Sequence, residues 1–209
     1  GNHKIICGDS TDKEVVKRLF GEERAKMCFT SPPYWLGFEY EQEKNQEDIL
    51  SHIDKQAQVL AEFVDSKIII NTGNIAAITK AQKITGKKQV AFLIDWWKEA
   101  LNKHNWLLRH IRIWAKSGQM RPSSRNDSVD MHWEYIETFT QEDGDAGFIA
   151  NFYNNAKNFE GQHKLGYGAA SWATSGIWTN IKGNARTDGH TAVFPVILPW
   201  RHLLMYSEV

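Results

Sequence analysis

Short apolar runs alternate along the chain with longer stretches in which apolar residues recur every three or four positions. The short runs are typical of buried β-strands, and the longer spacing is typical of helices with one apolar face. This pattern predicts strands at 3–7, 26–30, 67–71, 106–114 and 132–140. It predicts helices that begin at Ser10 or Thr11 and end near Leu19, and that span 47–63, 90–102 and 199–207.

Strands separated by helices indicate an α/β protein with a largely parallel sheet. In such sheets, ligands bind beyond the carboxyl ends of the strands. Four polar segments follow predicted strands: GDS (8–10), TSPPYW (30–35), NTGN (71–74) and the loop after Trp114. We therefore expect these segments to meet at one edge of the sheet. The remaining stretch, 142–189, lacks periodicity and is rich in glycine, asparagine and aromatic residues, which predicts a loop-rich subregion.

Charge and composition narrow the classes of function. The 25 basic and 25 acidic side chains give no net charge, which argues against a protein that simply coats nucleic acid. Residues 100–125, however, contain six basic and no acidic residues, so a local face could hold a phosphate backbone. The two cysteines and eight histidines show no ligand spacing, which predicts reduced thiols and no metal site. Without a long apolar run or a signal pattern, we expect a cytoplasmic protein with no membrane contact.

The segment TSPPYW places two adjacent prolines between a hydroxyl residue and two aromatic residues. Proline fixes its own backbone angle, keeps the preceding residue extended and has no N–H. The carbonyls of Thr30, Ser31 and Pro32 are therefore expected to lack local donors and to accept hydrogen bonds from a bound group. Tyr34 adds a flat face for a planar ring. Two prolines alone also suit a merely stiff turn, but their place after a buried strand favours a site for a planar amine.

TSPPYW and four further segments, in order along the chain, resemble motifs of the amino DNA methyltransferases, which transfer a methyl group from S-adenosylmethionine to an exocyclic amine of adenine or cytosine. TSPPYW resembles motif IV, in the form usual in N4-cytosine enzymes and shared by some adenine enzymes. HKIICGDS and KIIINTGN resemble the strands before and after it in the permuted, β-class order. IRIWAKSGQMRPSSRNDSVDMHWEYIETFT resembles the W-x-K to H-x-E-Y-I stretch, and GHTAVFPVILPWRHLLMYSE resembles motif X.

This resemblance implies a Rossmann-like methyltransferase sheet with helices on both faces, S-adenosylmethionine as cofactor and double-stranded DNA as partner. It divides the chain into a catalytic part (1–141), a target-recognition subregion (142–189) and a motif X segment that returns to the catalytic domain (190–209). The catalytic residues would be Ser31, Pro32, Pro33 and Tyr34, acting on a base flipped out of the duplex. Those expected at the cofactor are Asp9, Thr30, His190, Phe194 and Pro195. Those expected at the DNA are Trp35, Arg121, Ser123, Ser124, Arg125, Trp133 and Tyr135.

Plainer interpretations stay open for several of these residues. Asp9 also suits a helix cap, and the charged loop 121–125 also suits a solvated surface. Nine tryptophans are many for this length, and core packing is the default for any one of them, including Trp35 and Trp133.

The chain departs from the family at the loop that holds the methionine part of the cofactor. In the permuted order, motif X is followed by a strand and a D-P-F-x-G-x-G-T type loop. GYG at 166–168 is no substitute, because it neither follows an apolar strand nor precedes a helix. We therefore expect an incomplete sheet that lacks the first strands of the cofactor half, completed by a second polypeptide or a missing C-terminal segment. A non-catalytic DNA-binding or scaffolding subunit is the alternative.

Overall fold

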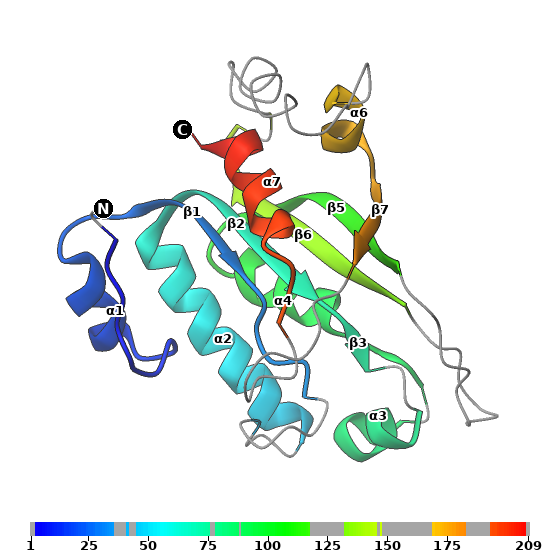
Figure 1. Ribbon diagram of the computed structural model, residues 1–209. Coiled ribbons are helices and arrows are strands. Elements are labelled where there is room, and N and C mark those ends of the chain that lie inside the picture. Colours follow the sequence, from blue (N-terminus) through cyan, green and yellow to red (C-terminus); the bar gives the residue numbers. More distant parts are fainter. Residues whose placement is uncertain are drawn as a thin grey trace.

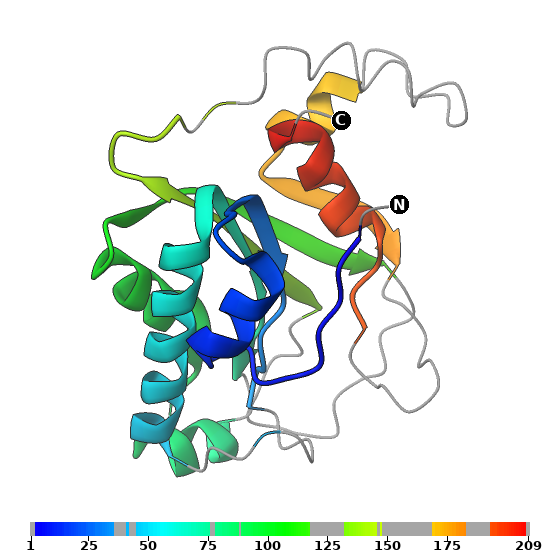
Figure 2. The same ribbon diagram turned by 90° about the vertical axis from the view of Figure 1, so that its left-hand side faces the viewer.

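The computed structural model describes residues 3–35, 41, 45–75, 78–87, 89–117, 132–145, 147, 169–182 and 193–207. In this part of the chain, a five-stranded sheet has helices on both faces (Figure 1). Figure 2 shows the layers from the side, with α2 (Gln46–Phe63) to the left of the sheet and α7 (Ile197–Tyr206) to its right. The predicted α/β layer architecture is confirmed.

The strands of this sheet are β1 (Ala25–Thr30), β2 (Val64–Thr72), β5 (Trp106–Ser117), β6 (Trp133–Gln141) and β7 (Ile177–Lys182). Their order is β1-β2-β6-β5-β7. Parallel pairing, as predicted, joins β1 to β2 and β5 to β7, whereas β6 is antiparallel to both of its neighbours. No helical pattern separates β5 from β6 in the sequence, which fits the antiparallel pairing of these two strands.

Alternation along β2 supplies two cores, one on each face of the sheet. Ile68 and Ile70 are fully buried in a core shared with α2 and α4 (Leu93–Asn102). Ile69, between them, is fully buried in a second core shared with α7. The α2 residues of the first core include Ile49, Ile53 and Ala57, which belong to the helical stripe predicted from the sequence. Both cores fix the ends of β1, β2 and β6, which carry the candidate site.

The remaining elements are short. The helices are α1 (Lys13–Phe20), α3 (Ile78–Thr85) and α6 (Ala169–Thr174), and β3 (Asn74–Ile75) pairs with β4 (Ala91–Phe92). Of these, only α1 was predicted, because capping residues and acidic residues precede and begin it in the sequence. Its cap is Asp12 instead of Ser10 or Thr11, since the Asp12 carboxylate accepts a 2.9 Å hydrogen bond from the Glu14 N–H.

The strand predicted at 3–7 is wrong. This segment has no regular structure, and the Ile5 side chain is 98% exposed. In Figure 1 the segment (dark blue) lies to the left of β1, beyond the edge of the sheet. No described strand pairs with the backbone of 3–7, and β1 pairs with β2 alone. An apolar run without a pairing partner stays irregular.

The range 142–189, expected as a separate subregion, contributes a strand to the main sheet. β7 pairs with β5 through Ile177 and Trp178, and the Trp178 side chain lies in the core beneath α7. Residues 146, 148–168 and 183–189 of that range lie outside the described part of the chain. None of the described helices has the length and apolarity needed to cross a bilayer.

Candidate active site

Three segments that are far apart in sequence meet at one edge of the sheet. β1 and β2 are parallel and end together, with Thr30 paired to Ile70. β6 is antiparallel to β2 and pairs Tyr135 with Thr72, so β6 begins where β2 ends. The expected meeting of TSPPYW with NTGN is therefore confirmed, and the start of β6 joins them. Segment 8–10 instead contacts α2, where the Ser10 hydroxyl accepts a 3.1 Å hydrogen bond from Gln56.

The Tyr34 hydroxyl connects these three segments. It lies 2.9 Å from the Asn71 carbonyl, 3.2 Å from Oε2 of Glu134 and 3.1 Å from Oγ of Ser31. A phenol has one proton to donate, and a carbonyl or a carboxylate only accepts. Ser31 must therefore be the donor to Tyr34. Its own lone pairs are left to accept a hydrogen bond from a bound group.

Gly73 lies directly against the Tyr34 ring. A Cβ atom at Gly73 would stand 2.8 Å from Cδ2 and 2.9 Å from Cε2 of Tyr34. Carbon atoms pack at about 3.5–4.0 Å, so no side chain fits at this position while the ring keeps its place. Gly73 therefore packs closely against the Cδ2–Cε2 side of the Tyr34 ring.

The charges around Tyr34 are ordered from the interior outwards. Burial raises the pKa of the Tyr34 phenol well above its usual value, and the negative charge of Glu134 raises this pKa further. Glu134 in turn forms an ion pair with Lys116 through Oε1, and the Lys116 ammonium lies 4.9 Å from the centre of the Trp114 ring. The phenol therefore stays protonated, while the carboxylate beside it keeps a cationic partner near the surface.

Hydrogen bonds also hold the end of β2 beneath the site. The Asn71 amide donates to the Tyr135 carbonyl at 3.0 Å, and the Thr72 hydroxyl donates to Oε1 of Glu137 at 2.5 Å. Glu137 is fully buried, and burial raises the pKa of its carboxyl to about 8. A protonated Glu137 thus lies behind the site, whereas Glu134 faces it.

The residues expected at the cofactor fall in two places. Thr30 is half-buried at the end of β1, and Phe194 packs edge-on against Phe29 at 5.4 Å between ring centroids. Pro195, next to Phe194, is buried. Asp9 is exposed before α1, where hydrogen bonds from the backbone and hydroxyl of Thr11 lower the pKa of its carboxyl. His190 lies outside the described residues.

The residues expected at the DNA differ in accessibility. Trp35 is 2% exposed in the core, where its ring lies edge-on to His52 at 5.9 Å, so its indole is not available to stack on a base. Its backbone φ is 53°, in the left-handed region. Trp133 and Tyr135 are half-buried at the start of β6, beside Glu134. Arg121, Ser123, Ser124 and Arg125 lie outside the described part of the chain.

Sequence reasoning missed Glu134, Lys116, Asn71 and Gly73 as parts of the site. All four lie within the quoted segments, but the contacts that matter depend on β6 running antiparallel to β2 and β5. A polar residue such as Glu134 between the aromatic residues Trp133 and Tyr135 was the available signal.

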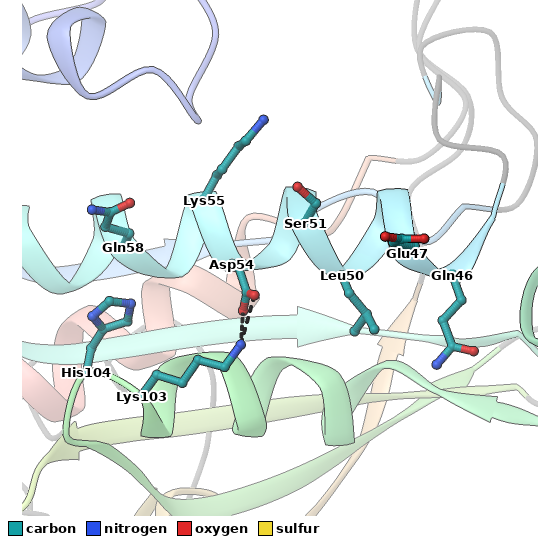
Figure 3. Close-up of a pocket in the computed structure, with 9 residues that line it drawn as sticks. All are labelled: Gln46, Glu47, Leu50, Ser51, Asp54, Lys55, Gln58, Lys103 and His104. Atoms are coloured by element: carbon teal, nitrogen blue, oxygen red, sulfur yellow. Dashed lines mark hydrogen bonds and ion pairs between the residues drawn. The ribbon is translucent and has the colours of Figure 1, made fainter.

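A groove of about 820 Å³ lies elsewhere, between α2 and the turn after α4 (Figure 3). Its side chains are largely polar, and Lys103 forms a salt bridge with Asp54 across it at 2.8 Å. The Tyr34 cluster does not line it. Asp54 and Lys103 are already paired and solvated, so this pair does not indicate a ligand.

Comparison with known proteins connects this geometry to a family. The family model N6_N4_Mtase, described as DNA methylase, matches residues 25–209. The chain is also similar to the Type II methyltransferase M.SfiI of Streptomyces fimbriatus, at 23% identity over 154 residues. That alignment covers 66% of this chain and 35% of M.SfiI, so the chain spans about a third of the length of this curated relative.

Solved structures show the same fold. TTHA0409 of Thermus thermophilus, crystallised with S-adenosyl-L-methionine, superposes with a TM-score of 0.62 at 21% identity, covering 96% of this chain and 72% of that chain. The cytosine-N4-specific PvuII DNA methyltransferase superposes with a TM-score of 0.59 at 14% identity, covering 96% of this chain and 69% of that chain.

Proposed function

The chain belongs to the DNA methylase family, and we propose that it holds the target base in a site-specific DNA methyltransferase that uses S-adenosylmethionine. The acceptor is the exocyclic amine of a flipped base. Cytosine N4 is the first candidate because of the S-P-P-Y form and the likeness to a cytosine-N4-specific enzyme, and adenine N6 is the alternative.

The observation that carries this proposal is the hydrogen-bond arrangement of Ser31 and Tyr34. Because the Ser31 hydroxyl donates its hydrogen bond to Tyr34, the Ser31 oxygen is left as an acceptor for a ligand. An amine is the donor that suits it, and the Pro32 carbonyl is the expected second acceptor. The amine of cytosine or adenine is conjugated into its ring and is a poor nucleophile. Two acceptors that fix its N–H groups favour a geometry with a free lone pair.

Tyr34 has a second role in this proposal. The flipped base is expected to stack on the part of the ring that Gly73 does not contact. Stacking offsets part of the few kcal/mol that unstacking from the duplex costs. The three hydrogen bonds of the hydroxyl hold the ring in position, so the base meets a preorganised surface.

The residues described near β1 fit part of S-adenosylmethionine, which supplies an electrophilic methyl group on a sulfonium. Phe194, Pro195 and Phe29 form an apolar wall suited to the adenine ring. The Asp9 carboxylate is exposed, and its lowered pKa keeps it ionised, which suits a hydroxyl or ammonium donor. The methionine part needs backbone donors such as those of a glycine loop.

We further propose that this loop comes from a second polypeptide or from a C-terminal segment beyond residue 209, docked on the free edge of β1. β1 has one strand partner among the described residues, and an unpaired edge is a ready template for another strand. Large apolar side chains are exposed in the N-terminal segment and around the start of α7: Ile5 (98%), Val193 (36%), Val196 (76%) and Ile197 (38%). An added layer of strands and helices would cover apolar side chains of this kind.

The test uses the full polypeptide that contains these residues, purified with any partner chain. Ser31→Ala is expected to lower the rate of methyl transfer at least about 100-fold while DNA binding is retained. Ser51→Ala, on the exposed face of α2, is the matched control and should act as wild type. Mass spectrometry of the product nucleosides distinguishes N4-methylcytosine from N6-methyladenine.

Two results would contradict the proposal. Unchanged methylation by Ser31→Ala would move the acceptor site to another part of the assembly. DNA binding by the wild-type protein without methylation of any base would instead identify a non-catalytic subunit.

A further inference from the structure

Glu134 is a charged group at the site to which neither the family resemblance nor the proposed function gives a role. Its Oε2 lies 3.2 Å from the Tyr34 hydroxyl, and its Oε1 pairs with Lys116. The side chain is only 13% exposed, so the carboxylate lies at the boundary between the buried phenol and solvent. A half-buried carboxylate aimed at a phenol needs a physical explanation.

The hydrogen bonds form a chain with a fixed direction. Ser31 donates to Tyr34, because Tyr34 is surrounded by acceptors on its other two sides. The Tyr34 proton is shared between the Asn71 carbonyl and Glu134 Oε2. Of these two acceptors, the carboxylate is the base that can take up a proton, whereas a backbone carbonyl only accepts the hydrogen bond. The chain therefore runs from the acceptor oxygen of Ser31 to Glu134.

We propose that Glu134 receives, through Tyr34 and Ser31, the proton that the target amine loses on methylation. This inference rests on the proposed function. The amine nitrogen uses its lone pair to bond the methyl carbon, and the electron pair of the broken carbon–sulfur bond stays on the donor's sulfur. The cationic nitrogen then releases one proton to Ser31 Oγ, Ser31 releases its proton to Tyr34, and Tyr34 releases its proton to Glu134.

Residues of the chain account for every proton and charge in this step. Ser31 and Tyr34 each gain and lose one proton and end neutral, Glu134 ends as a carboxylic acid, and the base ends as a neutral secondary amine. Neutralising Glu134 weakens its ion pair with Lys116, whose side chain is 37% exposed and borders solvent. The proton can thus leave to water on the side away from the base, and the site is reset.

Glu137 is the other carboxyl group beneath the site, and it cannot serve as this acceptor. Its Oε1 is held by the Thr72 hydroxyl, and it is fully buried without contact to solvent. Its pKa of about 8 means that it already carries a proton at neutral pH. Glu137 therefore provides a matched control on the same strand.

A purely structural role for Glu134, as an anchor for the Tyr34 ring, is the rival explanation. Glutamine has the same shape and can still hydrogen-bond the phenol, but it cannot accept a proton. An anchor therefore tolerates Glu134→Gln, whereas a proton acceptor does not.

The experiment compares kcat, KM for DNA and DNA affinity in the complete enzyme. Glu134→Gln is expected to lower kcat about 100-fold or more with KM and DNA affinity within about twofold of wild type, since general-base contributions are about 10²–10⁴-fold. Glu137→Gln should keep wild-type kcat. In Glu134→Ala, added formate should restore part of the lost kcat, and formamide, which has a similar shape but no charge, should not.

A second readout is independent of turnover. With ¹³C-labelled tyrosine, the Tyr34 phenol of Glu134→Gln should ionise at lower pH than that of wild type, because the Glu134 charge raises its pKa. Wild-type kcat in Glu134→Gln, or rescue by formamide as well as formate, would overturn the inference while leaving the proposed function standing. Absence of methylation by the wild-type enzyme would instead refute the proposed function itself.

Discussion

Gly73→Ala is the substitution that tests the packing of the site most directly. The described glycines with a positive φ are Gly21 and Gly86, so alanine at position 73 meets no backbone strain. Its entire cost comes from the Cβ atom, which would lie 2.8 Å from Cδ2 of Tyr34. Restoring a contact of about 3.5 Å requires the ring to move by about 0.7 Å.

A movement of this size breaks the hydrogen bonds of the ring. If it lengthened the shortest of them, the 2.9 Å bond from Tyr34 to Asn71, by the full amount, that bond would reach about 3.6 Å, beyond hydrogen-bond range. Overpacking of this kind costs about 1–3 kcal/mol of stability. A displaced acceptor oxygen on Ser31 should cost up to about 100-fold in methyl transfer.

The assay measures denaturant unfolding and methylation of the complete enzyme in parallel. Gly176→Ala is the matched control, since a Cβ there has no neighbour within 4 Å. In a Tyr34→Phe background, Gly73→Ala should destabilise less than it does alone, because the ring is no longer held by its hydroxyl. Wild-type stability and turnover for Gly73→Ala would refute this account of the Tyr34 site.

Two further predictions concern buried titratable groups. His202 is fully buried, and burial lowers its pKa to about 3. As pH falls from 7 to 5, the unfolded chain binds a proton at this histidine and the folded protein does not, so the free energy of unfolding should fall by about 2 kcal/mol. Denaturant titrations of His202→Phe should lack this difference. Burial raises the pKa of Glu137 to about 8, so the free energy of unfolding should fall as pH rises from 4.5 to 8. Glu137→Gln should be more stable than wild type at pH 8 and equally stable at pH 4. A gain in stability that is independent of pH would contradict burial as the cause.

The parts of the fold that the sequence predicts are those with a long periodic signal. The apolar stripe of α2 and the continuous apolar run of β2 each span enough residues for their period to be recognised. β7 and α3 were missed because six or eight residues among glycines and polar residues carry little pattern. Residues 3–7 have the pattern of a strand but no partner, and pairing is a property of the whole sheet.

The candidate site, too, was predicted from the sequence only in part. TSPPYW indicated an amine-binding loop because the effect of proline on the backbone is local. The roles of Gly73 and Glu134 depend on which strands are neighbours, and the sequence alone does not state that β6 lies beside β2. Trp35 illustrates the opposite error, since this aromatic residue of the loop was expected at the DNA and is buried in the core at 2% exposure.

The two halves of the proposed reaction are held by different parts of the fold. Among the described residues, the hydrogen bonds that orient Tyr34 come from the loop after β1, the end of β2 and the start of β6. These strands lie between two cores that do not include Asp9, and Phe194 only packs against one of them. On the proposed function, these three segments hold the target base, and the segment docked at the free edge of β1 would complete the methyl-donor site.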